Sequence, residues 1–236
     1  MKKTTVLFDL DGTLIGMNQN EFIRLYFIAI LDKLALMGYD KKSMYIALEE
    51  AIRATKNNDG TLTNEARFWK TFDEATGGAS KELRNLICSF YQNEFVRVLE
   101  ATCFPYPYAS DILKFVKNKG LRVVLATNPL FPAVATHARI KLGGMSPDDF
   151  EYITAYENSS FCKPNPSYFA ELLDKIGVKP EECIMVGNDT RDDFSAHALG
   201  IPVFILTKGL INDTGVDLST YPYGSINEFM EYIEAL

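Results

Sequence analysis

The chain of 236 residues has no dense stripe of Lys and Arg, no internal repeat and no low-complexity tract. Its formal net charge is −7, which argues against a nucleic-acid-binding surface. An acidic protein can still bind phosphate where local lysines and helix N-termini supply a positive field. The charge balance therefore excludes nucleic acid as a partner better than it excludes phosphorylated metabolites.

Long hydrophobic runs are also missing. The most apolar stretch, residues 22–37, is too short to span a bilayer and is interrupted by Arg24, Asp32 and Lys33. The opening MKKTTVLFDL has an apolar run too short for the core of a signal peptide, and the run ends in Asp9. These absences predict a soluble, cytoplasmic protein that has no membrane partner.

Cysteine is scarce and scattered, with no C-x-x-C pair and no cluster of Cys and His. The four residues are Cys88, Cys103, Cys162 and Cys183. This usage is typical of small buried side chains in a reducing cytosol, and it predicts neither a disulfide framework nor a cysteine metal site.

What the sequence does contain is a series of short apolar runs of the kind that form buried strands. They cover residues 6–10, 123–126, 152–155, 184–186 and 203–206. Helical periodicity separates the later runs, at residues 110–118 and 167–176. A capping box, Ser225-Ile226-Asn227-Glu228, precedes a last helix. Strands that alternate with helices predict an α/β fold with a Rossmann-like parallel sheet.

One segment, from Gly16 to about Glu100, shows no strand. Its helical periodicity covers residues 21–36, 41–55, 64–75 and 80–99. We predict that residues 16–103 form a helical cap domain, inserted into a core made of residues 1–15 and 104–236. Ligands of open parallel sheets bind beyond the carboxyl ends of the strands, so an insert that leaves from this edge would cover the site as a lid.

Polar residues follow the predicted strands. Asp9 and Asp11 end the first run, where strand periodicity would point both side chains the same way, and Gly12 permits a sharp turn. Thr127-Asn128 follows the second run, and Lys163 opens the helix before the fourth. The fourth run ends in Gly187-Asn188-Asp189-Thr190-Arg191-Asp192-Asp193. Each motif alone is typical of caps and turns, but together they predict one site at the edge of the sheet.

These motifs resemble those of haloacid-dehalogenase-superfamily hydrolases that carry a helical cap of the C1 type. Residues 9–13 match the first motif, D-x-D-G-T, and Thr127 matches the Ser or Thr of the second. Lys163 matches the third motif, and residues 189–193 match the acidic fourth. The resemblance covers nearly the whole chain. It implies a Mg²⁺-dependent phosphatase that hydrolyses a small phosphomonoester through an aspartyl-phosphate.

The resemblance also implies a role for each residue. Asp9 would be the nucleophile and a Mg²⁺ ligand. Asp11 would be the general acid and then the base, with its main-chain carbonyl facing the metal. Thr127, Asn128 and Lys163 would hold the phosphoryl oxygens, and Asp189 and Asp193 would complete the metal site. Because a phosphomonoester dianion repels carboxylates, such an acidic site needs a divalent cation and fixed donors.

The fourth motif reads Gly-Asn-Asp where many relatives have Gly-Asp-Ser. Either Asn188 or Asp189 could therefore face the metal. A carboxylate offsets the charge of Mg²⁺ and an amide does not, which favours Asp189.

Several alternatives within the family differ at the second aspartate. Dehalogenases and phosphonate-cleaving relatives lack an aspartate at the place of Asp11, and P-type pumps carry D-K-T-G-T and membrane spans. A phosphomutase and a catalytically idle phosphate-binding module stay open. The predicted oligomeric state is a monomer or a weak homodimer.

Substrate specificity is expected to depend on the insert and on the loop after Asp11. The candidates there are Asn18, Asn20, Arg24, Arg67 and Trp69. His137 and Arg139, in the helix after the second run, could reach the pocket, although positions on the helix surface are favoured. For His197 we expect an ordinary position on a helix.

Overall fold

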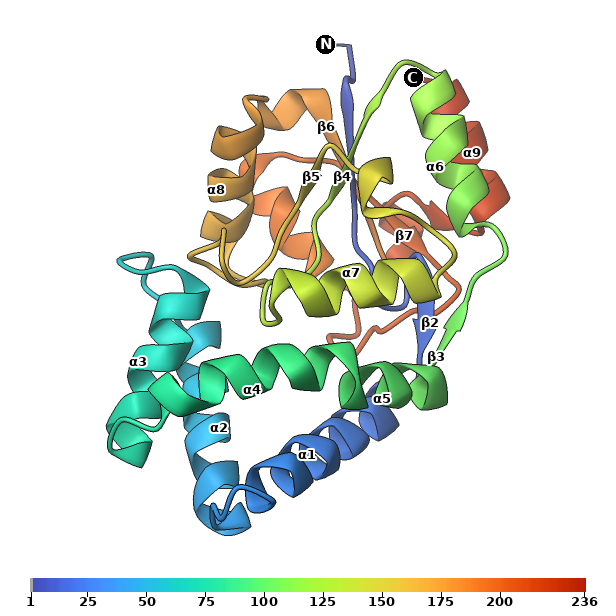
Figure 1. The fold of residues 1–236 in the computed structure, drawn as a ribbon. Coiled ribbons are helices and arrows are strands. Elements are labelled where there is room, and N and C mark those ends of the chain that lie inside the picture. Colours follow the sequence, from blue (N-terminus) through green and yellow to red (C-terminus); the bar gives the residue numbers. More distant parts are fainter. Residues whose placement is uncertain (1) are drawn as a thin grey trace.

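The computed structural model describes residues 2–236, apart from the side chains of Asn85 and Cys88. Its main sheet has six strands in the order β5-β4-β1-β6-β7-β8, and neighbouring strands are parallel (Figure 1). In that order the strands are Tyr152–Ile153, Arg122–Leu125, Thr5–Phe8, Cys183–Gly187, Val203–Leu206 and Tyr223–Gly224. The predicted α/β fold with a Rossmann-like parallel sheet is confirmed.

The central strand β1 is buried on both faces, as its unbroken apolar sequence predicts. Val6 and Phe8 pack into the larger hydrophobic cluster, together with helices α6 (Ala109–Asn118) and α9 (Ile226–Glu234). Leu7 points to the other face, into a second cluster built on α8 (Pro166–Ile176). Helices on both faces leave the carboxyl ends of the strands as the open edge of the layer.

The segment between β1 and α6 is almost entirely helical. A two-stranded antiparallel sheet, β2 (Ile15–Met17) with β3 (Cys103–Pro105), closes its base. Between these strands lie α1 (Gln19–Ala35), α2 (Lys41–Lys56), α3 (Asn64–Thr76), α4 (Ser80–Gln92) and α5 (Glu94–Thr102). We call α1–α5 the helical insert. The division into a cap of residues 16–103 and a core stays a prediction.

Two details of this segment were predicted wrongly. The strand-free region was expected to begin at Gly16, but β2 continues to Met17. Gly16 is needed there because a Cβ atom at this position would come within 2.1 Å of the Phe104 ring. A single helix was expected over residues 80–99, whereas the structure has α4 and α5 with a break at Asn93.

The insert contacts the core through α7 (Ala133–Leu142), against which both α4 and α5 pack. Figure 1 shows α7 lying between the sheet and these two helices. Aromatic rings connect the two parts: Phe22 of α1 packs edge-on against Phe131 of the core, with ring centroids 5.9 Å apart. These contacts hold the insert over the open edge of the sheet.

Cys103, Cys162 and Cys183 are buried and unpaired, as expected, while the side chain of Cys88 lies outside the described part of the chain. Within residues 2–236 we find no helix with both the length and the apolar character needed to cross a membrane.

Candidate active site

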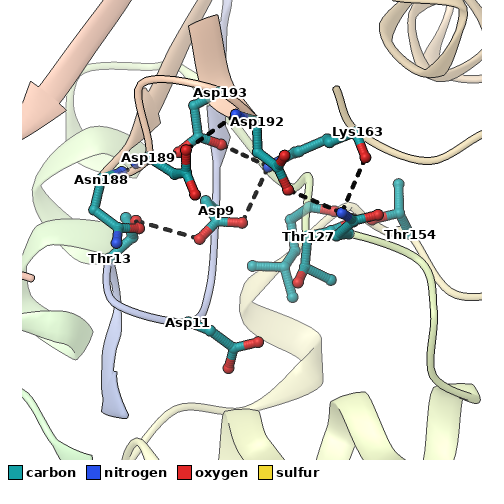
Figure 2. A network of polar contacts seen from close by, with 12 residues as sticks. Asp9, Asp11, Thr13, Thr127, Thr154, Lys163, Asn188, Asp189, Asp192 and Asp193 are labelled. Atoms are coloured by element: carbon teal, nitrogen blue, oxygen red, sulfur yellow. Dashed lines mark hydrogen bonds and ion pairs between the residues drawn. The ribbon is translucent and has the colours of Figure 1, made fainter. Parts of the chain in front are cut away.

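Asp9 directly follows β1, and a buried lysine fixes its side chain. Lys163 Nζ donates to Asp9 Oδ1 at 3.0 Å and to Asp193 Oδ1 at 2.7 Å, and the lysine side chain is only 1% exposed (Figure 2). Burial raises the pKa of Asp9 to about 7; Lys163 opposes the rise, and the nearby Asp193 and Asp11 add to it. Burial lowers the pKa of Lys163, but the two carboxylates outweigh it and raise that pKa above its usual value.

Asp193 organises the loop that follows β6. Its Oδ2 accepts hydrogen bonds from the main-chain N–H groups of Asn188 and Asp189, both at 3.0 Å, while its Oδ1 binds Lys163. Gly187 makes this approach possible, because a Cβ atom there would lie 1.9 Å from Asp193 Oδ2. Since both oxygens are engaged, Asp193 suits an orienting role better than direct coordination of a metal.

The two candidates in the fourth motif have different surroundings. Asn188 Oδ1 accepts from the Thr13 hydroxyl at 2.8 Å, and its Nδ2 donates to the Gly209 carbonyl at 2.7 Å. Asp189 Oδ1 accepts from the main-chain N–H groups of Arg191 and Asp192, which aligns its carboxylate. Asp189 and Asp9 both line the same cleft. Because the Asn188 amide is committed to the protein, the geometry favours Asp189 as the metal-facing group.

Thr127 and Asn128 follow β4, as the strand pattern predicted. The Thr127 carbonyl accepts from the hydroxyls of Thr154 at 2.7 Å and Tyr168 at 3.0 Å, which fixes the loop. Asn128 Nδ2 donates to Asp192 Oδ2 at 2.9 Å, whereas its Oδ1 is buried without a partner. Asn128 Nδ2 also donates to the Lys163 carbonyl at 3.3 Å, so the side-chain amide is held by these two partners. A contact between Asn128 and a phosphoryl oxygen stays a prediction.

Asp11 makes a different contact from Asp9. Its Oδ2 forms an ion pair with Arg139 of α7, while its Oδ1 is buried without a partner. Asp9 and Asp11 both line the cleft, but the strand does not set their directions, because β1 ends at Phe8 and the chain then turns. Gly12 makes that turn with φ +88°, a conformation that favours glycine.

Arg139 lines the cleft, which was the less favoured of its two expected positions. Its side chain is 2% exposed, donates to Thr136 Oγ1 at 3.1 Å and lies over the Phe131 ring at 5.1 Å. The favoured helix-surface position was wrong because α4, α5 and β3 pack against α7 and the Arg139 side chain is buried. No local pattern in the sequence shows that the insert covers this face of α7.

The site contains more carboxylates than cations. Asp9, Asp11, Asp189, Asp192 and Asp193 all line one cleft, and burial raises the pKa of Asp192 as well. Among the described residues, the cations paired with this group are Lys163 and Arg139. Hard oxygen donors in excess of positive charge suit Mg²⁺.

The side chains alone do not form a ready-made metal site. Within residues 2–236, no three His, Cys, Asp or Glu side chains converge as a set of metal ligands. The donor set that fits is the carboxylates of Asp9 and Asp189 with main-chain oxygen, which is the contribution that the resemblance implies for Asp11.

The cleft lies between the open edge of the sheet and the helical insert, and its volume is about 1250 Å³. Of the predicted specificity residues, Trp69 lines it as a buried aromatic. Arg24 pairs with Glu21 at 2.6 Å, and Arg67 pairs with Asp59 at 2.6 Å. These two arginines therefore have structural partners on the insert itself.

The remaining polar candidates have local roles. Asn18 caps α1 by accepting from the main-chain N–H of Glu21 at 3.3 Å, and Asn20 is exposed. The His197 ring packs against Phe194 and Tyr221, with centroids 5.0 and 5.3 Å away. The structure thus gives neither Asn18 nor His197 a position in the cleft.

The family model of haloacid dehalogenase-like hydrolases matches residues 3–200. The chain belongs to this family, and the sequence-based assignment to its phosphatases is confirmed. The phosphoglycolate phosphatase of Escherichia coli (strain K12) is 25% identical over 252 residues, which cover 95% of this chain and 90% of that protein. The glyceraldehyde 3-phosphate phosphatase of Methanocaldococcus jannaschii is 26% identical, with 98% and 97% covered.

A pyrophosphatase of Bacillus pumilus is 28% identical over 198 residues, which cover 83% of this chain and 79% of that protein. Among solved structures, a HAD phosphatase from Thermococcus onnurineus superposes with a TM-score of 0.58 at 21% identity, with 98% and 97% of the two chains covered. At that identity the similarity describes the fold alone.

Proposed function

We propose that the protein is a Mg²⁺-dependent phosphatase that hydrolyses a phosphomonoester through an aspartyl-phosphate on Asp9. The observation that carries this proposal is the arrangement around Asp9. A carboxylate at the end of the central strand faces an open cleft, with Lys163 Nζ 3.0 Å from one oxygen and with Asp189 lining the same cleft. A fixed carboxylate beside a buried ammonium group is suited to in-line attack on phosphorus.

Each of the side chains at the site would have a separate role in the reaction. Asp9 and Asp189 would hold Mg²⁺, which when bound offsets the negative charge of the phosphoryl group and of the carboxylates. Lys163 would keep Asp9 aligned and bind a phosphoryl oxygen, and Thr127 would donate its hydroxyl to another. Asp193 would hold these groups in position, because it binds both Lys163 and the loop after β6.

Asp11 would protonate the leaving alkoxide and later remove a proton from the attacking water. In this structure its carboxylate pairs with Arg139. Because Arg139 occupies Asp11 Oδ2, that contact must open before this oxygen can face the leaving group. We therefore assign Arg139 a positioning role: it keeps Asp11 at the cleft between turnovers.

The helical insert would act as the cap of this site. Closure over the bound ester would exclude bulk water and bring the insert's side chains to the alcohol. The predicted cytoplasmic location and the monomeric or weakly dimeric state stay predictions.

Release of p-nitrophenolate from p-nitrophenyl phosphate tests the proposal. We expect turnover with Mg²⁺, little with Ca²⁺, which prefers longer bonds and higher coordination numbers, and none in EDTA. Undiminished turnover in EDTA, or equal turnover with Ca²⁺, would contradict the assigned metal. Lys163→Met should lose activity, because the phosphoryl group and Asp9 both lose their cation.

A further inference from the structure

We propose that the preferred substrates are phosphomonoesters whose alcohol is uncharged, largely apolar and at least the size of an aromatic ring. This inference rests on the proposed function and names the substrate class of the same site. The evidence for it is the wall of the cleft that faces Asp9. The chemistry of this wall differs from that of the carboxyl edge of the sheet, where the catalytic residues lie.

Aromatic side chains form a large part of that wall. The cleft lining includes Phe22, Tyr26, Phe27, Phe68, Trp69 and Phe131. Phe131 belongs to the same loop as Thr127, and its ring lies 5.6 Å from that of Tyr26, so the aromatic surface begins close to the phosphoryl site. The hydroxyl groups of Tyr26 and Tyr91 bond to each other at 3.0 Å, which leaves the rings as apolar surface.

Apolar side chains on this wall are also unusually exposed. Ile23 and Ile46, from α1 and α2, each line the cleft with 47% of their surface accessible, and Phe104 lines it at 52%. Scattered apolar residues on a surface need no explanation, but a group that shares one cleft with a catalytic site is typical of a ligand pocket. An apolar alcohol would remove this surface from water.

The charges in the cleft disfavour a second anionic group on the substrate. Both buried cations near the reaction are already paired, Lys163 with Asp9 and Asp193, and Arg139 with Asp11. Arg53 and Lys56 line the cleft from α2, but both are exposed and share that helix with Glu49 and Glu50 of the same lining. An anion buried without a partner is costly, so a carboxylate such as that of phosphoglycolate lacks a buried site here.

The size of the cleft also exceeds what a short alcohol needs. Pockets for drug-sized ligands measure about 300–1,000 Å³, and this cleft measures about 1250 Å³. A two- or three-carbon alcohol would leave the aromatic wall in contact with water, whereas a ring attached through a short linker would reach it from a phosphate held at Asp9.

Three alkyl esters with Mg²⁺ test the inference: ethyl phosphate, 2-phenylethyl phosphate and phosphoglycolate. Ethanol and 2-phenylethanol are both primary alcohols, so their esters differ mainly in the ring. We expect kcat/KM for 2-phenylethyl phosphate to exceed that for ethyl phosphate by about 10- to 100-fold, as burial of one ring allows. We expect phosphoglycolate to be no better than ethyl phosphate.

Exposed positions allow matched variants that do not endanger the fold. Ile46→Asn, on the wall, should reduce the ratio of the 2-phenylethyl to the ethyl rate by about 3-fold or more. Leu36→Asn, at the end of α1 and outside the cleft lining, is the control and should leave the ratio unchanged. An equal fall in both variants would contradict a role for the wall.

A failure of this inference can be told apart from a failure of the proposed function. If phosphoglycolate or ethyl phosphate is hydrolysed as efficiently as 2-phenylethyl phosphate, the substrate class is wrong and the phosphatase assignment stands. If no ester is hydrolysed, calorimetry with non-hydrolysable 2-phenylethylphosphonate and ethylphosphonate decides. If 2-phenylethylphosphonate binds more tightly than ethylphosphonate, the apolar site is supported although the proposed phosphatase activity is not. If the two bind equally, or neither binds, the inference is overturned.

Discussion

The carboxyl edge of the sheet and the facing wall of the helical insert enclose the same cleft but differ in chemistry. At the edge, charged groups are buried and fixed by named partners, as Lys163 is between Asp9 and Asp193. On the wall, apolar groups such as Ile23 and Ile46 are half-exposed. A fixed, charged edge suits a reaction common to many esters, and an adaptable apolar wall suits recognition of one class of alcohol.

The most damaging change to the edge should be Asp9→Asn. It removes the nucleophile but keeps the shape of the side chain, so we expect a loss of at least ~10⁴-fold in phosphate release. Phosphate release measured for every ester in the panel checks this. If the variant loses activity toward only some of the esters, Asp9 contributes to recognition of the alcohol and not to the common reaction. That result would contradict the difference between the edge and the wall.

Asp11→Asn should have a smaller effect that depends on the leaving group. General acid–base groups contribute ~10²–10⁴-fold, and an alkoxide needs a proton as it departs. The loss of turnover should therefore be large for 2-phenylethyl phosphate. A nitrophenolate is a stable anion, so the first phosphoryl transfer from p-nitrophenyl phosphate should be affected less. Equal slowing of both first steps would show that Asp11 is not the acid.

Arg139→Met should affect stability, because Arg139 lies where the edge and the insert meet. The change leaves the partly exposed Asp11 carboxylate without its cation and removes the stacking on Phe131. We expect a loss of about 1–3 kcal/mol in the free energy of unfolding, or about 3–9 °C in Tm for a chain of this size.

The control for this prediction is Arg24→Met, because Arg24 pairs with Glu21 on the exposed surface of α1. Thermal unfolding of both variants should show a change in Arg139→Met alone. Equal changes in the two would mean that the Asp11–Arg139 pair contributes no more than a surface pair.

The smallest expected effect is a dependence of stability on pH. The pKa of Asp9 is about 7 in the fold against a usual 3.8, so ionisation of Asp9 opposes folding. Its contribution to stability is fully present below about pH 4 and is lost as the pH rises through 7. Without metal, Asp9→Asn should therefore unfold a few degrees above the wild type at pH 8, and the difference should shrink toward pH 4. A constant difference would contradict the raised pKa.

The sequence predicted the residues at the carboxyl edge of the sheet better than it predicted the contacts between that edge and the helical insert. Asp9, Thr127 and Asp189 follow strands, and local apolar runs reveal where strands end. The Asp11–Arg139 pair joins residues 128 positions apart, on elements whose relative placement depends on packing of the insert against α7. The sequence did not predict that Met17 lies in a strand, because β2 is three residues long and pairs with the distant β3.

The central claim is that the edge acts through a covalent phosphoryl group on Asp9. The most direct test is to mix Asp11→Asn with p-nitrophenyl phosphate and Mg²⁺, quench in acid and map the modified peptide by mass spectrometry. We expect a burst of nitrophenolate near one equivalent per site and one phosphoryl group on Asp9, because no base remains to activate water. Sustained release of nitrophenolate with no phosphorylated peptide, or a phosphoryl group on another residue, would contradict the account.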